Sequence, residues 1–129
     1  MAFTQDELDY LAEQRLGRLA TQQKDGTLQV NPVGFSYNKE LGTIDIGGFN
    51  MTRSRKYRNV AANGRAAFVV DDIVSVSPWR VRCLEIRGTA EVVEDPDPLI
   101  RLTPTHLISF GLDKADVAPH EMVANIRDV

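Results

Sequence analysis

The chain has 129 residues, 43% of them hydrophobic, which predicts one globular domain over residues 1–129 rather than a disordered chain. Its 18 acidic and 15 basic residues give a formal net charge of -3, which argues against general nucleic-acid binding. We expect a cytoplasmic protein without a disulfide, a metal site or a membrane partner, because the sequence has one cysteine, no Cys/His cluster, no signal peptide and no membrane-spanning apolar stretch.

The first predicted element is a helix over residues 4–17. Thr4 and Glu7 have the spacing of a capping box, in which each side chain accepts a hydrogen bond from a free backbone N–H. Apolar residues recur at helical spacing, at Leu8, Leu11, Ala12 and Leu16. Gly17 is suited to end the helix, because glycine adopts the left-handed conformation at little cost.

The segments that follow are predicted mainly as strands. Alternating and β-branched patterns indicate strands over residues 18–21, 27–38, 43–48, 65–70, 80–93 and 99–112. Pro32 has no backbone N–H to donate, so its strand is expected at a sheet edge or with a bulge. Residues 71–79 predict a loop, and residues 113–129 predict a loosely structured tail with one short helix.

A mainly β fold follows from this order of elements. About six closely spaced strands, with one helix before them and one after the third strand, are typical of a small antiparallel barrel. Helices do not alternate regularly with strands, and no glycine-rich dinucleotide or P-loop motif is present. These observations argue against a doubly wound nucleotide-binding sheet.

Residues 51–70 hold five basic residues and no acidic one, although the whole chain is acidic. Tyr57, Val60 and Ala61 recur at helical spacing, which predicts a helix from Thr52 to about residue 62. Either Thr52 or Ser54 can cap the start of this helix, and Asn63-Gly64 can end it.

The start of this helix is a candidate anion site. Free backbone N–H groups and the positive end of the helix dipole favour an anion at the first turn. Arg55 and Lys56 add charge-assisted donors at the same place. A solvated basic face is the alternative interpretation. We favour the anion site because the cluster begins at a helix start, follows the flexible residues 46–50 and has no acidic neighbour.

Residues 43–72, TIDIGGFNMTRSRKYRNVAANGRAAFVVDD, resemble the phosphate-binding segment of the pyridoxamine 5'-phosphate oxidase-like, split-barrel flavoprotein superfamily. Residues 15–38 resemble the first hairpin of that superfamily, and residues 78–93 resemble its later long strand. Residues 99–113, LIRLTPTHLISFGLD, are similar to the C-terminal part of a branch of deazaflavin (coenzyme F-420)-dependent oxidoreductases. The residues after Phe110 do not resemble the substrate-binding segment of the pyridoxamine phosphate oxidases proper.

The resemblance implies an FMN-binding-like split antiparallel β-barrel that forms a homodimer with each cofactor at the subunit interface. It implies that Arg55 and Lys56 hold a cofactor phosphate and that the backbone of residues 30–35 lies along the flavin ring. Trp79 and Arg80 are interpreted either as a surface anchor or as part of the cofactor cleft. Arg82 is interpreted either as a solvent-facing side chain or as a contact for an anionic tail. The predicted cofactor-binding residues are Asn31, Pro32, Val33, Gly34, Thr52, Ser54, Arg55, Lys56, Trp79, Arg80 and Arg82.

The resemblance further implies an oxidoreductase that transfers a hydride between coenzyme F-420 and an unsaturated organic substrate. The alternatives are an FMN-dependent oxidase or reductase of the same fold, or a cofactor-binding protein without catalytic activity. Single-stranded nucleic-acid binding is less favoured, because the basic segment lacks interleaved aromatic residues for base stacking. No nucleophile or paired carboxylate is predicted as catalytic, which fits a protein whose cofactor carries the chemistry.

Overall fold

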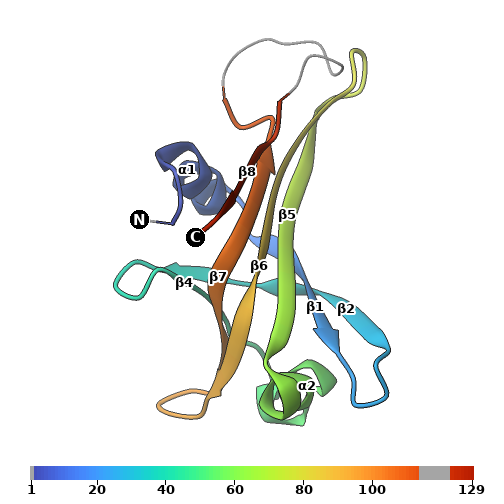
Figure 1. Ribbon diagram of the computed structural model, residues 1–129, viewed down its shortest axis with the longest axis vertical. Helices are drawn as coiled ribbons and strands as arrows, with labels where there is room; N and C mark the ends of the chain where they lie inside the picture. Colours follow the sequence, from blue (N-terminus) through green and yellow to red (C-terminus); the bar gives the residue numbers. More distant parts are fainter. Residues whose placement is uncertain (1, 114–122) are drawn as a thin grey trace.

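The computed structural model describes residues 2–113 and 123–129, which form a curled, eight-stranded antiparallel sheet with two α-helices (Figure 1). The elements are α1 (Gln5–Glu13), β1 (Leu16–Gln22), β2 (Leu28–Gly34), β3 (Ser36–Asn38), β4 (Thr43–Ile46), the 3-10 helix η1 (Met51–Arg53), α2 (Arg55–Asn63), β5 (Arg65–Ser75), β6 (Arg80–Val93), β7 (Leu99–Phe110) and β8 (Asn125–Asp128). The strand order is β2-β1-β5-β6-β7-β4-β3, and β8 pairs with β7. The predicted mainly β, split-barrel fold is confirmed.

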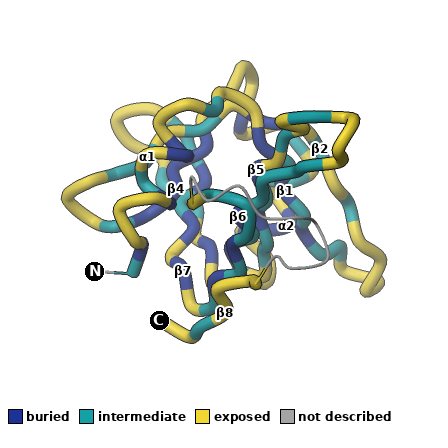
Figure 2. The backbone as a smooth tube through the Cα atoms, turned by 90° about the horizontal axis from the view of Figure 1, so that it is seen from above, coloured by how far each residue is buried: buried dark blue, intermediate teal, exposed yellow. Residues whose placement is uncertain are grey.

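The hydrophobic core lies inside the curl of the sheet (Figure 2). Leu19, Phe68, Ile86 and Leu107 are paired across four neighbouring strands and are at most 1% exposed. Strand residues point alternately to the two faces, so this inner row alternates with an outer row that is more exposed. Burying each of these side chains contributes about 1.5–3 kcal/mol to stability.

Helix α1 begins as predicted and ends earlier. Thr4 accepts a hydrogen bond from the Glu7 N–H, and Glu7 accepts one from the Thr4 N–H, so both halves of the capping box are present. Gln14 already has extended backbone, and Gly17 lies inside β1 instead of ending the helix. A Cβ at position 17 would lie 2.2 Å from the Phe68 ring, so glycine here permits core packing.

Strand β2 lies at one end of the strand order, which agrees with the prediction for Pro32. Pro32 pairs with Arg18 of β1, and the other edge of β2 has no strand partner among the described residues. Only one side of the β2 backbone is paired with a described strand, which is the position in a sheet where proline is tolerated.

Two further segments differ from the sequence predictions. Residues 71–75, expected in a loop, extend β5, because Asp72 pairs with Arg82 and Ile73 pairs with Val81 in a long hairpin with β6. The expectation of a loose tail is wrong at its end, where β8 pairs with β7 in a register that places Ile126 opposite Ile108. The short helix expected in this tail would fall largely on residues 114–122, which lie outside the described residues.

No helix among the described residues is long and apolar enough to cross a membrane. In the same described part of the chain, no group of three or more His, Cys, Asp or Glu side chains is placed to hold a metal ion.

Candidate functional site

The start of α2 is built by a side-chain cap. Ser54, rather than Thr52, is the N-cap: its Oγ accepts a hydrogen bond from the Tyr57 N–H at 3.3 Å and donates one to the Met51 carbonyl at 2.7 Å. Thr52 lies one step earlier, in η1. The backbone N–H groups of Arg55 and Lys56 donate to no described acceptor, which is usual for a first helical turn.

Positive charge gathers at this helix start without a direct ion pair to a described carboxylate, although Arg55 lies near enough to Asp25 to contribute to its lowered pKa. Arg55 is exposed, and its Nη1 donates to Gln23 Oε1 at 3.2 Å. Lys56 is half-buried, and Arg53 and Arg58 are exposed. None of these four side chains forms an ion pair with a described carboxylate. Free N–H donors, the helix dipole and unpaired cations together favour a bound phosphate group.

Polar contacts hold α2 against the hairpin of β1 and β2. The Asn59 amide is buried and donates to Thr21 Oγ1 at 3.1 Å and to Gln29 Oε1 at 3.5 Å. Asn63 Nδ2 donates to the Gln22 carbonyl at 2.8 Å. These contacts fix the basic helix start beside strand β2. The sequence analysis did not identify them, because they join residues about 30 to 40 positions apart in the chain.

Strand β2 presents two different faces. Pro32 and Gly34 are exposed on the outer face of the sheet, whereas Val33 is buried in the core and Asn31 is half-buried on the same inner side. A Cβ built on Gly34 meets no atom within 4 Å, so the space beside this backbone is open. The outer side of Pro32 and Gly34 is therefore accessible to a flat ring, whereas Val33 can contribute only its backbone there.

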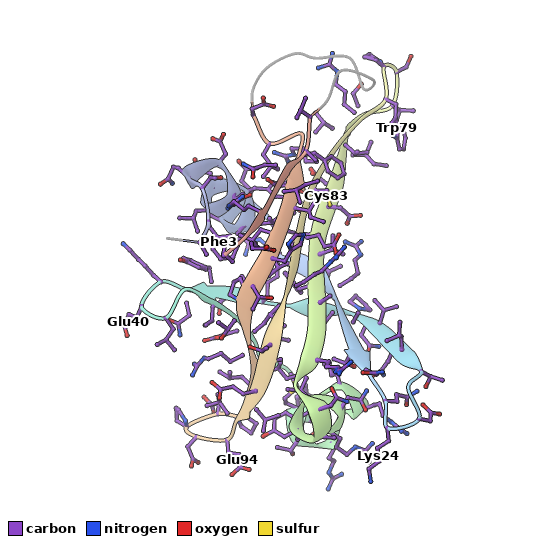
Figure 3. All side chains as sticks on the ribbon, viewed as in Figure 1. Phe3, Lys24, Glu40, Trp79, Cys83 and Glu94 are labelled. Carbon is purple, nitrogen blue, oxygen red and sulfur yellow. The ribbon has the colours of Figure 1, made fainter. Side chains whose placement is uncertain are left out.

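The remaining predicted site residues lie on the long β5–β6 hairpin, toward the end of the molecule that is far from α2 (Figure 1). Trp79 lies at the tip of the β5–β6 hairpin, far from Lys24 and from α2 (Figure 3). It is half exposed, and Arg80 at the start of β6 is half-buried. A single chain therefore joins α2 to the part of the β1–β2 hairpin that holds Gln23 and Gln29, but Trp79 lies at the far end of the long β5–β6 hairpin.

Arg82 is held in an internal network. Its Nε and Nη2 donate to the two Asp72 carboxylate oxygens at 3.0 and 2.7 Å, and its Nη1 donates to Glu13 at 3.0 Å. Its guanidinium also lies 4.8 Å from the centre of the Tyr10 ring, whose hydroxyl donates to Asp72. Hydrogen bonds from Arg82 lower the pKa of Asp72, despite partial burial. These contacts fasten α1 to the long hairpin and engage all three guanidinium nitrogens of Arg82.

The outer face of the sheet is apolar around β1, β2 and β5. Val30, Ala20 and Ala67 form one apolar cross-strand row, beside a second row in which Arg18 lies between Pro32 and Val69. Val30 is 65% exposed, and a shallow hollow of about 250 Å³ lies over this region. Two ion pairs border it, Arg18 with Asp71 and Arg87 with Glu85, each at 2.6 Å.

Cys83 lies on the same outer face, opposite Asp71 and Phe110 in the ladder, and is half-buried. Burial, with the nearby carboxylates Asp71 and Glu85, raises the pKa of its thiol to about 11. The thiol is therefore protonated at neutral pH, which agrees with a packing role rather than a nucleophilic one.

Comparison with known proteins shows the family to which this chain belongs. The family model described as pyridoxamine 5'-phosphate oxidase matches residues 3–116. A 5a,11a-dehydrotetracycline/5a,11a-dehydrooxytetracycline reductase of Streptomyces rimosus is 43% identical over 122 residues, covering 88% of this chain and 86% of that protein. A solved F420 reductase is 29% identical, with a TM-score of 0.60 over 77% of this chain and 94% of that one.

A conserved hypothetical protein of Mycobacterium tuberculosis shares the fold at 18% identity, with a TM-score of 0.70 over 88% of each chain. The family match and the shared fold both agree with the split barrel described above. The chain belongs to the pyridoxamine 5'-phosphate oxidase family.

Proposed function

We propose that this oxidoreductase transfers a hydride between coenzyme F-420 and an unsaturated organic substrate. The observation that carries the proposal is the positive charge of Arg55 and Lys56, which form no ion pair with a described carboxylate, at a capped helix start held against the β1–β2 hairpin. When bound, the deazaflavin supplies the hydride chemistry, so the protein needs no nucleophile of its own.

The described residues fit such a cofactor in two places. Arg55, Lys56 and the free N–H groups of the first turn of α2 would hold the phosphate. Residues 31–34 would lie along the ring, because Pro32 and Gly34 leave the outer side of β2 open and flat. Ser54 shapes the helix start, since its hydroxyl is used by the cap itself.

The relatives support a reductase and favour the deazaflavin. One relative is named as a reductase of a dehydrotetracycline, and one solved neighbour is named an F420 reductase. An FMN-dependent reaction is the second candidate, and the description of the matching family as pyridoxamine 5'-phosphate oxidase favours it. Both candidates use the same phosphate site, so they differ in the cofactor rather than in the fold.

We further propose that the active form is a homodimer with the cofactor at the subunit interface. The apolar outer face around Val30 and Ala67 offers a surface that a second copy would cover. Trp79 lies at the opposite end of the chain's fold from α2, and Arg80 follows it at the start of β6 (Figures 1 and 3). A second copy would supply them from its own hairpin and would exclude water from the ring.

Titration of the purified protein with F-420 and with FMN, followed by fluorescence, tests the proposal. Lys56→Ala should weaken cofactor binding by about 1.5–3 kcal/mol, the scale of a hydrogen bond to a charged group. Arg65→Ala is the matched control, because Arg65 is exposed at the far end of α2 and should leave affinity unchanged. Equal affinity of wild type and Lys56→Ala would remove Lys56 from the site. Failure of both cofactors to bind would reject the function.

A further inference from the structure

A second concave site lies where α1 meets the end of strand β2. This pocket has a volume of about 480 Å³, and Leu11 of α1 lines it together with Phe35 and Tyr37 of the β2–β3 connection. Phe35 packs edge-on against the core residue Phe68, with ring centres 5.1 Å apart, so the base of the pocket is held by the core. Leu11, Phe35 and Tyr37 give one part of the pocket an apolar lining, which can contact the hydrocarbon part of an organic ligand.

Polar groups converge on the same pocket. Gln14, Arg15 and Ser36 line it, and Arg15 is the one charged side chain among its lining residues. Arg15 is exposed and forms no ion pair with a described carboxylate. The nearest acid in sequence, Glu13, instead forms an ion pair with Arg82 at 3.0 Å. The pocket therefore presents an available guanidinium to a negatively charged oxygen.

The pocket adjoins the strand assigned to the cofactor ring. Gly34 lines the pocket and is also the last residue of β2, where it pairs with Leu16. Arg15 immediately precedes Leu16, so it lies beside the end of the same two-stranded ladder. The basic start of α2 contacts the opposite end of this hairpin, through Gln23. The phosphate site and the pocket therefore lie near opposite ends of β2. This strand has seven residues and spans about 20 Å.

We propose that this pocket binds the substrate and that Arg15 binds a negatively charged carbonyl or enolate oxygen of a planar, conjugated enone. The inference rests on the proposed function for the position of the ring, which would place the reacting carbon between Gly34 and the pocket. It assigns a substrate class to a pocket that shares only Gly34 with the predicted cofactor-binding residues.

The positive charge of Arg15 is opposite in sign to the negative charge that the reaction generates on the substrate oxygen. An enone that accepts a hydride at its β carbon loses its carbon–carbon double bond, and the electron pair moves onto the carbonyl oxygen as an enolate. A solvent proton then adds to the α carbon and completes the saturated ketone, while the reduced deazaflavin is oxidised. A guanidinium fixed beside the oxygen stabilises the negative charge as it develops.

Binding of two small probes tests the inference without turnover. Cyclohexane-1,3-dione is an enolate at neutral pH and resembles the charged species, whereas cyclohex-2-en-1-one has the same ring and no charge. We expect the isotope-labelled protein to bind the enolate about tenfold more tightly in NMR titrations, with amide shifts at Gly34 and Ser36. Arg15→Gln should abolish this preference, and Arg15→Lys should retain part of it. Lys39→Gln, which removes an exposed charge outside this pocket, should retain all of it.

The outcomes separate this inference from the proposed function. Equal enolate affinity in wild type and Arg15→Gln, or shifts confined to other parts of the protein, would overturn the pocket assignment. F-420 titration of the same variants gives an independent readout, and Arg15→Gln should bind F-420 as wild type does. If F-420 fails to bind every variant while the enolate preference persists, the pocket assignment stands and the proposed cofactor is wrong. Circular dichroism of each variant checks that it folds.

Discussion

The Arg127 guanidinium holds the Glu7 carboxylate with both nitrogens, at Nη2–Oε1 and Nη1–Oε2 distances of 2.5 and 3.0 Å, although the residues are 120 positions apart. Glu7 is fully buried and also accepts hydrogen bonds from Ser109 Oγ at 2.6 Å and from the Thr4 N–H at 2.9 Å. Arg127 donates in addition to the Ala2 carbonyl. This cluster ties α1 to β7 and β8, so the helix that lines the proposed substrate pocket is held by both chain ends.

The first prediction concerns the stability of this cluster. Glu7→Gln should lower the free energy of unfolding by about 3 kcal/mol, the low end for breaking a buried ion pair, because Arg127 keeps a quarter of its side chain exposed. Urea unfolding followed by circular dichroism measures the change. Glu13→Gln is the matched control on the same helix, since its ion pair with Arg82 is exposed and should be worth about 0–1 kcal/mol. Equal losses in the two variants would show that burial does not set the strength of the pair.

The second prediction is the pH dependence of the same cluster. Burial alone would raise the pKa of Glu7, but hydrogen bonds from Arg127, Ser109 and Thr4 outweigh it and lower the pKa below its ordinary value of 4.5. The unfolded chain then binds more protons than the folded one just below pH 4.5, so this contribution is complete above that pH and is lost as the pH falls through the folded pKa.

Unfolding free energies of wild type and Glu7→Gln, measured against pH, check this expectation. The difference between the two proteins should be constant at neutral pH and should shrink in acid. A difference that grows in acid would mean that the pKa of Glu7 is raised instead.

The third prediction follows from Tyr57. Its hydroxyl oxygen is buried and has no hydrogen-bond partner in the described structure, which costs free energy relative to water. Tyr57→Phe should therefore leave stability unchanged or raise it by up to about 1 kcal/mol. Tyr10→Phe is the matched control, because the Tyr10 hydroxyl donates to Asp72 at 2.8 Å and its loss should destabilise by about 1–2 kcal/mol. A loss of stability in Tyr57→Phe similar to that in Tyr10→Phe would indicate that the Tyr57 hydroxyl has a partner, such as a bound water.

Local signals in the sequence predict much of this fold. The capping box at Thr4 and Glu7 depends on residues three apart, and the left-handed Gly64 that ends α2 follows its helix directly. The covalent structure of Pro32 predicts an edge strand or a bulge, and β2 lies at the edge. Where neighbouring residues determine the local structure, the sequence pattern is sufficient to predict it.

Tertiary contacts account for the errors. Gly17 has the spacing of a helix end, yet it lies in a strand because the Phe68 ring packs against it. Strand β8 has a polar sequence, and its partner strand and the contact of Arg127 with Glu7 hold it in place. In the candidate site, the pattern predicts a basic helix start, but the contact of Arg55 with Gln23 and the pocket around Arg15 depend on packing between distant segments.

The fourth prediction tests the proposed homodimer. Wild type should give a light-scattering mass of about twice the 14.4 kDa of one chain. Val30→Asp places a charge on the apolar outer face, where burial against a second copy would be costly, so it should shift the mass toward the monomer and weaken cofactor binding. Leu41→Asp is the matched control, because Leu41 is 57% exposed in the β3–β4 turn, away from that face. A wild-type monomer that binds cofactor at full affinity would contradict the interface site.

The last prediction concerns the choice between F-420 and FMN. F-420 has acidic glutamates beyond its phosphate, so a protein that selects it should offer further positive charge near the phosphate site. Arg53 and Arg58 are suited to this, because both are exposed beside the start of α2 and neither has an ion pair with a described carboxylate. Arg82, whose charge is already paired with Asp72 and Glu13, should contribute little.

Each exposed contact is worth roughly 0–1 kcal/mol, so two of them would favour F-420 over FMN by about tenfold. Salt screens exposed charges first, so the preference should shrink as ionic strength rises, while FMN affinity changes less. Dissociation constants for both cofactors, measured at low and high salt in wild type and in the Arg53→Gln/Arg58→Gln double variant, test this. The double variant should lose the preference for F-420 and its salt dependence together, while Arg82→Gln should keep both. If FMN binds wild type as tightly as F-420 at low salt, the deazaflavin assignment is wrong and the FMN-dependent reaction replaces it.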